Sequence, residues 1–170
     1  TGLSDETRVS PFEFACVFGH EHIALLLINH GCDIHRASEA DGSTPLLMAC
    51  QYGHAEVAAL LVEKGAEIDQ AQNDGATPLF VACQKGHLDI AAMLVDKGAN
   101  LDQAKNDGAT PLFIACQHGR TEVAALLVEK GATIEQADND GFTPLFMACL
   151  NGHLKTAAML LGKGAKIDEA

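Results

Sequence analysis

The chain repeats itself with a period of 33 residues, and this repetition limits its fold more than any other feature. Residues 74–106 read DGATPLFVACQKGHLDIAAMLVDKGANLDQAKN, and residues 107–139 match them at 21 of 33 positions. Two further copies begin with DGSTPL at Asp41 and DGFTPL at Asp140, and a more divergent copy occupies residues 1–40. Such a chain stacks one small structural unit on its copies, so each residue must be interpreted within its repeat.

Each copy carries the signals of two short helices. Thr77 and Pro78 predict the start of the first helix, because a threonine hydroxyl can accept from a free backbone N–H and proline fits the first helical turn. Gly86 predicts its end. The apolar spacing within residues 88–97 predicts a second helix, which Gly98 closes.

The loop between successive copies carries the turn signal Asn-Asp-Gly, here at residues 106–108. Each unit is therefore helix, turn, helix and projecting turn. This pattern resembles the ankyrin repeat family. The resemblance is carried by DGxTPL at 41–46, 74–79, 107–112 and 140–145, by Gly-His at 53–54, 86–87 and 152–153, and by Gly-Ala at 65–66, 98–99, 131–132 and 164–165.

The resemblance implies an all-α, ankyrin-repeat solenoid of stacked helix-turn-helix units with projecting β-turn or hairpin loops. It implies one repeat domain over residues 1–170, with repeats at 1–40, 41–73, 74–106, 107–139 and 140–170. The family usually has a histidine after Thr-Pro-Leu, where it joins neighbouring repeats. This chain has Leu47, Phe80, Phe113 and Phe146 there, so we expect apolar packing instead, and Arg120 replaces the histidine of one Gly-His turn.

The first copy departs most from the pattern. Ser10-Pro11-Phe12 replaces Thr-Pro-Leu, and Glu13 stands where later copies have a large apolar residue. We interpret this copy as a terminal repeat with a polar outer face, or as the first retained repeat of a longer array. One additional residue within 31–42 predicts a longer first turn. At the other end, we expect the last helix pair to be the least protected part.

The cysteines and histidines recur with the fold and not as one distinctive cluster. Cysteine occupies one equivalent position in five copies: Cys16, Cys50, Cys83, Cys116 and Cys149. Packed helices lie about 8–10 Å apart, too far for disulfides between equivalent sites. We expect these thiols, and that of Cys32, to be buried as small apolar groups, and unpaired thiols indicate a reducing, intracellular location, cytoplasmic or nuclear.

A second ladder consists of His20, His54, His87 and His153, which we expect to hold the turn after glycine by hydrogen bonds, as in the resembled family. Zinc needs four ligands about 2–2.3 Å from one point, and equivalent residues of neighbouring repeats lie too far apart. No residue set combines a nucleophile, a base and an orienting group. The sequence therefore predicts no enzyme, and no catalytic, cofactor or metal residues.

The charge and hydropathy of the chain narrow the class of partner. The formal net charge is -12 with only 11 Lys and Arg residues, which argues against nucleic acid as a partner. No apolar run reaches the length needed to cross a membrane. We expect a protein ligand with a basic or mixed surface. A monomer is the simplest state, and end-to-end stacking at the C-terminal repeat is the alternative.

We expect partner-binding residues where the copies differ, on the turn tips and at the exposed ends of the first helices. The tip residues are Ser43, Asp74, Ala76, Lys105, Asp107, Asp138, Asp140 and Phe142. The helix-end residues are Gln51, Tyr52, Gln84, Lys85, Gln117, His118, Leu150 and Asn151. In the resembled family these places line a concave groove for protein partners. Tyr52, Phe142 and Leu150 are the predicted anchors, although drift at exposed positions would also explain the differences.

The first hypothesis for function is therefore a non-enzymatic protein-binding module. Two alternatives remain open. The chain could serve as a structural spacer or targeting segment of a larger enzyme or of a secreted effector in a host cytosol, or it could be an engineered, consensus-like scaffold. The near-identity of the repeats favours the engineered scaffold, and the irregular turn near Ala40 disfavours it.

Overall fold

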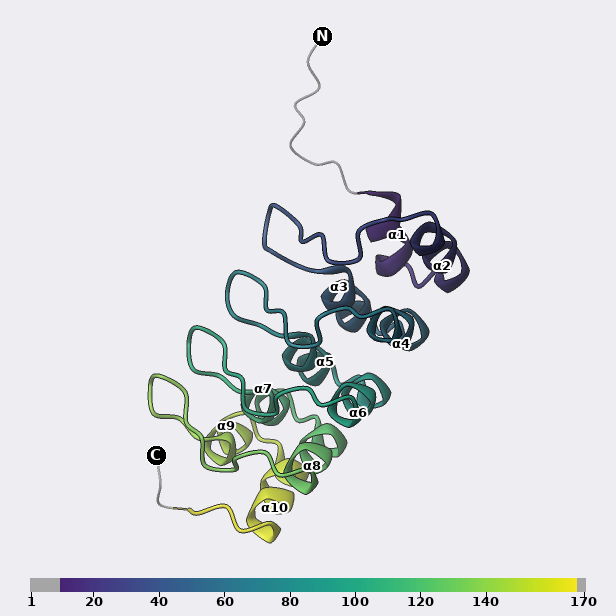
Figure 1. Cartoon of the computed structure of the whole chain (residues 1–170). Helices are drawn as coiled ribbons and strands as arrows, with labels where there is room; N and C mark the ends of the chain where they lie inside the picture. The colour runs from purple at the N-terminus through teal and green to yellow at the C-terminus, as the bar shows by residue number, and fades with distance from the viewer. Residues whose placement is uncertain (1–9, 168–170) are drawn as a thin grey trace.

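The computed structural model describes residues 10–167, and in this range helices follow one another in pairs along a stack (Figure 1). The first helices of the pairs are α1 (Pro11–Val17), α3 (Pro45–Tyr52), α5 (Pro78–Lys85), α7 (Pro111–Gln117) and α9 (Pro144–Leu150). The second helices are α2 (Glu21–Asn29), α4 (Ala55–Glu63), α6 (Leu88–Asp96), α8 (Thr121–Glu129) and α10 (Leu154–Gly162). The turn tips project from the side opposite the second helices. The predicted all-α solenoid is confirmed.

The helices begin and end at the residues that the sequence signals indicate. Thr77 caps α5, because its hydroxyl accepts the Phe80 N–H at 3.2 Å, and Pro78 follows at the first helical position. Gly86 ends α5 with a φ of 83°, which a side chain would disfavour. The second helix of this repeat ends at Asp96, one residue before the predicted end.

The core is a continuous series of interfaces between repeats. First helices of neighbouring repeats pack closely on one another, and second helices pack more loosely. Leu79, Leu94, Leu112 and Leu127 are fully buried between them. Phe80 is buried as well, as is its equivalent in the next repeat, which confirms that apolar packing occupies the position of the family's histidine.

One set of polar ties between repeats comes from the position after glycine. His54 Nε2 donates to Val17 O of the preceding repeat at 2.8 Å, and His153 makes the equivalent contact to Gln117 O at 3.0 Å. These histidines therefore join neighbouring repeats, whereas the sequence predicted that they hold the turn of their own repeat. Arg120 takes over this role, since its Nε donates to Gln84 O at 3.3 Å.

The two ends of the array differ from expectation. Glu13 is buried and forms a capping box with Ser10, so it gives the first repeat no polar outer face. The expectation of a polar outer face is wrong, because that repeat exposes large apolar side chains instead. The expectation that Cys149 is buried is also wrong: its side chain is exposed, and Cys32 is only partly buried.

The first turn is longer by one residue, as predicted. Its closing hydrogen bond runs from Ser38 N–H to Ser43 O at 2.9 Å, whereas the next turn closes from Gln72 N–H to Ala76 O at 3.0 Å. The tips are turns, because residues 10–167 contain no strand. Within the same residues, no helix is long and apolar enough to cross a membrane.

Candidate protein-binding edge

The predicted contact residues form two rows that run along the stack. The tip row contains Ser43, Asp74, Ala76, Lys105, Asp107, Asp138, Asp140 and Phe142. The helix-end row contains Gln51, Tyr52, Gln84, Lys85, Gln117, His118, Leu150 and Asn151. A first helix of eight residues, such as α5, separates the two rows by about 12 Å. The structure therefore brings these residues to parallel edges and not to one pocket.

Each tip is a tight turn held by its own aspartate. At the tip between the third and fourth repeats, Gly108 N–H donates to Lys105 O at 2.9 Å and Lys105 N–H donates to Ala109 O at 2.9 Å. Asp107 Oδ1 accepts the Ala109 N–H at 3.1 Å, which closes the turn through a side chain. The tip conformation is therefore fixed within each repeat.

Neighbouring tips are also bonded to one another. Asn106 N–H donates to Asp74 O at 2.9 Å, and Asn106 Nδ2 donates to Asn73 O at 3.1 Å. Asn139 repeats both contacts one repeat later, to Asp107 O at 2.9 Å and to Asn106 O at 3.0 Å. The tips therefore form one hydrogen-bonded ladder that fixes their spacing.

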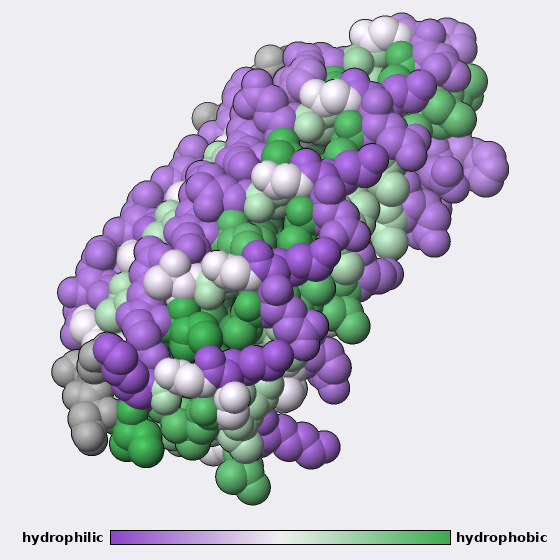
Figure 2. Space-filling model, turned by 60° about the horizontal axis from the view of Figure 1, so that its bottom comes forward, coloured by the Kyte–Doolittle hydropathy of each residue, from purple (hydrophilic) through white to green (hydrophobic). Residues whose placement is uncertain are grey.

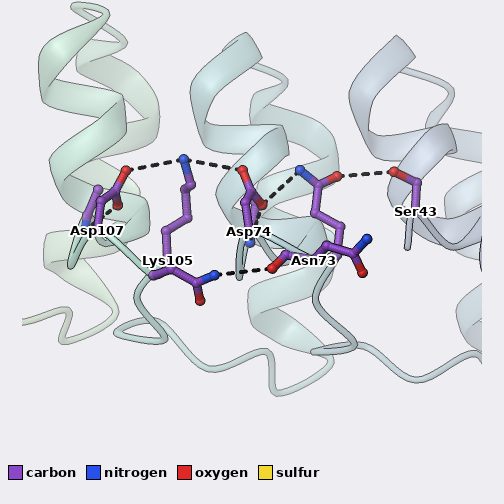
Figure 3. A network of polar contacts seen from close by, with 9 residues as sticks. Ser43, Asn73, Asp74, Lys105 and Asp107 are labelled. Carbon is purple, nitrogen blue, oxygen red and sulfur yellow. Dashed lines mark hydrogen bonds and ion pairs between the residues drawn. The ribbon is translucent and has the colours of Figure 1, made fainter. Parts of the chain in front are cut away.

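A network of side chains extends along three tips (Figure 3). Ser43 Oγ donates to Gln72 Oε1 at 3.1 Å, and Gln72 Nε2 donates to Asp74 Oδ1 at 2.9 Å. Lys105 Nζ lies between two carboxylates, 3.3 Å from Asp74 Oδ2 and 3.3 Å from Asp107 Oδ2. Much of the polar chemistry of the tip row is thus used within the chain.

The network shifts the pKa values of its members. Burial acts to raise the pKa of Asp74, but hydrogen bonds from the Ala76 N–H, Gln72 and Lys105 outweigh it, so the pKa is lowered. Burial acts to lower the pKa of Lys105, but its bonds to Asp107 and Asp74 outweigh it, so the pKa is raised. Both groups stay charged at neutral pH.

Two predicted contact residues are not available to a partner. Ser43 is 4% exposed and Ala76 is 2% exposed, so the expectation that they lie on the outer edge is wrong. Both follow the Asp-Gly turn directly and lie beneath it, where the chain enters the next helix. Asp74 and Asp107 remain about half exposed and can still meet a partner.

The helix-end row is the more exposed of the two. Tyr52 is 51% exposed, and Lys85 and His118 are exposed at the same position of the next two repeats. The pKa of His118 is lowered by burial and by the nearby positive charge of Arg120. Each repeat thus presents a different side chain, aromatic, cationic or imidazole, on an unchanged frame.

Phe142 and Leu150 are exposed because they lie in the last described repeat. Phe142 replaces the buried Ala109 of the preceding repeat, and its ring stacks on Phe146 with centroids 4.6 Å apart. Phe18 is not among the predicted contact residues, although it is exposed and occupies the Tyr52 position of the first repeat. The repeat register identifies this position, because Gly19-His20 aligns with Gly53-His54.

The four buried cysteines of the ladder are not activated thiols. Burial raises the pKa of Cys16 and of Cys116 to about 12, and raises the pKa of Cys50 and Cys83 further. These thiols are therefore protonated at neutral pH and are poor nucleophiles. Residues 10–167 contain no group of three or more His, Cys, Asp or Glu side chains that could hold a metal ion.

Comparison with known proteins is consistent with this geometry. A family model described as "Ankyrin repeats (3 copies)" matches residues 12–105 and 99–170. No curated protein matches the chain.

Proposed function

Because the chain belongs to the ankyrin repeat family, whose repeats are generally protein–protein interaction modules, we propose that it is a non-enzymatic module of one repeat domain. A protein partner binds along the face made by the turn tips and the first helices. The helix-end row supports this proposal, since its exposed side chains change from repeat to repeat while the frame stays constant. A surface already fixed by the tip ladder loses little conformational entropy on binding.

The partner in this proposal has basic residues around an apolar contact. Tyr52 is the central anchor, because a large aromatic side chain with a hydroxyl contributes strongly to interfaces. Asp107 and Asp140 supply exposed carboxylates on the tip row. Phe142 and Leu150 add apolar surface at the C-terminal end. The net charge of -12 favours a positively charged ligand and speeds its approach at low salt.

The alternative is a spacer within a larger enzyme or effector. A spacer needs only the regular frame, and the sequence differences in the helix-end row would then be drift at exposed positions. We place the protein inside a cell, because unpaired thiols such as the buried Cys83 are typical of reducing compartments.

The test compares two double variants in pull-downs from cell extract with quantitative mass spectrometry. Tyr52→Ala/His118→Ala removes two exposed groups of the helix-end row. Lys64→Ala/Lys97→Ala removes two exposed groups at the ends of second helices and is the matched control. We expect the first variant to lose proteins that the parent and the control retain, and purified partner to bind it at least about tenfold more weakly. Equal recovery by all three proteins would exclude the helix-end row as the binding surface.

A further inference from the structure

One position at the ends of the first helices changes its chemistry along the stack while it stays exposed. It is the residue directly before the glycine that follows each first helix, and we call its members the pre-glycine row. In successive repeats they are Phe18, Tyr52, Lys85, His118 and Asn151, and all are exposed. Exposure is therefore a property of the position and not of one repeat. The row begins with two aromatic side chains and continues with a cation.

Arg120 brings a second cation to this row. Its side chain reaches back over the preceding repeat, where Nε donates to Gln84 O at 3.3 Å, next to Lys85. A Cβ built on Gly86 would lie 2.8 Å from Arg120 Cδ, so the arginine lies against the end of α5. Lys85 and Arg120 therefore place two positive charges at the junction of the third and fourth repeats.

These two charges are not neutralised by carboxylates of the chain. Within residues 10–167, neither Lys85 nor Arg120 forms an ion pair, whereas Lys105 lies between two carboxylates. Asp89 and Glu122 follow closely in sequence, in the first turns of α6 and α8, and they pair with neither cation. Lys85 and Arg120 can therefore attract a negatively charged group of a partner.

His118 shows that the electrostatic field at this junction is locally positive. Its pKa is lowered by burial and then by the nearby Arg120, His153 and Lys85. His118 is therefore neutral at pH 7, and the charge of the junction comes from Lys85 and Arg120. This local charge is opposite in sign to the net charge of -12. At about 0.1 M salt, exposed charges more than about 10 Å apart are largely screened, so a bound group interacts mainly with the cations beside it.

We propose that the pre-glycine row binds an extended segment of a protein partner, with apolar residues at one end of the segment and aspartates or glutamates at the other. The apolar residues meet Phe18 and Tyr52, and the carboxylates meet Lys85 and Arg120. The segment belongs to the partner of the proposed function, on which this inference rests. The basic residues that the acidic tip row favours belong to another part of the same partner.

The pitch of the repeats determines the spacing of residues in this segment. Neighbouring first helices pack about 8–10 Å apart, and successive members of the row are separated by a similar distance. An extended chain advances about 3.3 Å per residue, so every third residue meets a new repeat. A segment that spans Phe18 to His118 is therefore about ten residues long. Figure 2 shows hydrophobic and hydrophilic groups recurring from repeat to repeat along one face of the stack.

The test is selection of phage-displayed random peptides, about twelve residues long, on the whole chain. We expect enriched peptides to carry Asp or Glu about three or six residues from an aromatic or aliphatic residue. Lys85→Glu/Arg120→His should abolish the enrichment of acidic residues and keep that of apolar residues. Histidine makes the equivalent contact to the preceding repeat elsewhere in the array, so we expect this variant to fold. Lys64→Glu/Lys97→Gln changes the net charge equally on exposed ends of second helices and is the matched control.

The direction of the salt dependence is the decisive measurement. An enriched acidic peptide and the chain as a whole are both negatively charged. If the local cations determine binding, the affinity measured by fluorescence anisotropy falls as salt is added, whereas repulsion by the net charge would make it rise. We expect Lys85→Glu/Arg120→His to weaken binding of these peptides at least about threefold and the control to change it less than about twofold.

Four results would overturn the proposal: no peptide is enriched, enriched peptides show no excess of acidic residues, the excess persists in Lys85→Glu/Arg120→His, or the affinity rises with salt. None of them contradicts the proposed function, which fails only if the pull-down variants recover the same proteins as the parent. Circular dichroism verifies folding, and Lys85→Glu alone replaces a double variant that does not fold.

Discussion

The tip ladder makes Gly108 and Gly141 a matched pair for measuring how strongly neighbouring repeats are coupled. Both glycines occupy the same place in a turn tip, with φ values of 87° and 88°. A Cβ at Gly108 would lie 2.6 Å from the backbone nitrogen of Asn139, whereas a Cβ at Gly141 would have no atom within 4 Å. Alanine therefore strains the backbone at both sites but displaces a neighbouring tip at only one.

The expected difference follows from two contributions. Alanine in the left-handed region costs about 1–2 kcal/mol relative to glycine, and this cost is common to both variants. Only Gly108→Ala also breaks the 2.9 Å hydrogen bond from Asn139 N–H to Asp107 O, which contributes about 0.5–1.5 kcal/mol. We expect Gly108→Ala to lower the free energy of unfolding by about 1 kcal/mol more than Gly141→Ala.

A second pair of glycines separates the effect of contact with a neighbouring tip from the effect of a glycine's position in the array. Gly98 and Gly164 follow second helices with φ values of 92° and 97°, and neither has an atom within 4 Å of a built Cβ. Gly98→Ala therefore gives the cost of strain in the central part of the chain, and Gly164→Ala gives the cost at the end. Gly108→Ala should lower the free energy of unfolding by more than Gly98→Ala does. Gly141→Ala should lower it by the same amount as Gly164→Ala.

The assay is urea unfolding followed by far-ultraviolet circular dichroism, with hydrogen exchange to detect separate opening of the last repeat. If Gly108→Ala and Gly98→Ala destabilise the chain equally, the tip ladder does not couple the repeats and the reasoning is refuted.

Three further predictions concern single sites. Cys149 should react with a thiol reagent in the native protein, whereas Cys83 should react only on unfolding, as mass spectrometry of labelled peptides can verify. Thr77→Ala should lower the free energy of unfolding in urea by about 1 kcal/mol, because the α5 cap is lost. Lys105→Met should lower the free energy of unfolding by up to about 1 kcal/mol at pH 7. This loss of stability should disappear as the pH falls through the lowered pKa of Asp74. A carboxyl group whose pKa is lowered in the folded state stabilises the fold only while it is ionised.

Each of these predictions has a result that contradicts it. Equal labelling rates of Cys83 and Cys149 would mean that the first helices separate readily. An unchanged midpoint for Thr77→Ala would show that packing alone holds α5. For Lys105→Met, a stability loss that stays the same in acid would rule out the ion pairs as its cause, and Lys97→Met, on an exposed lysine, is the matched control.

Much of the fold could be predicted from the sequence because its signals are local. A capping threonine, a proline and a left-handed glycine act within a few residues, so α5 could be placed almost to the residue from Thr77, Pro78 and Gly86. The period then fixed the stacking order. The longer first turn could be predicted for the same reason, since one added residue is visible without any knowledge of contacts.

The contacts between repeats could not be predicted in the same way. A recurring position shows that a residue belongs to the frame, but it does not show which atom the residue reaches. His54 bonds to Val17 O of the preceding repeat, and Arg120 makes the equivalent bond with different chemistry. Cys149 was expected to resemble Cys116, but burial depends on a neighbouring repeat and not on the residue itself. Ser43 varies although it is buried, so variation did not identify exposure.

The longer first tip shows where this architecture tolerates a change of length. Ser38 to Ser43 spans one residue more than the later turns, yet Asn73 N–H still donates to Asp41 O at 2.8 Å. The additional residue lies in the exposed part of the loop, and the hydrogen bond that joins this tip to the next one is kept. Foreign peptides grafted at this loop should therefore be displayed at a fixed pitch without altering the superhelix behind them.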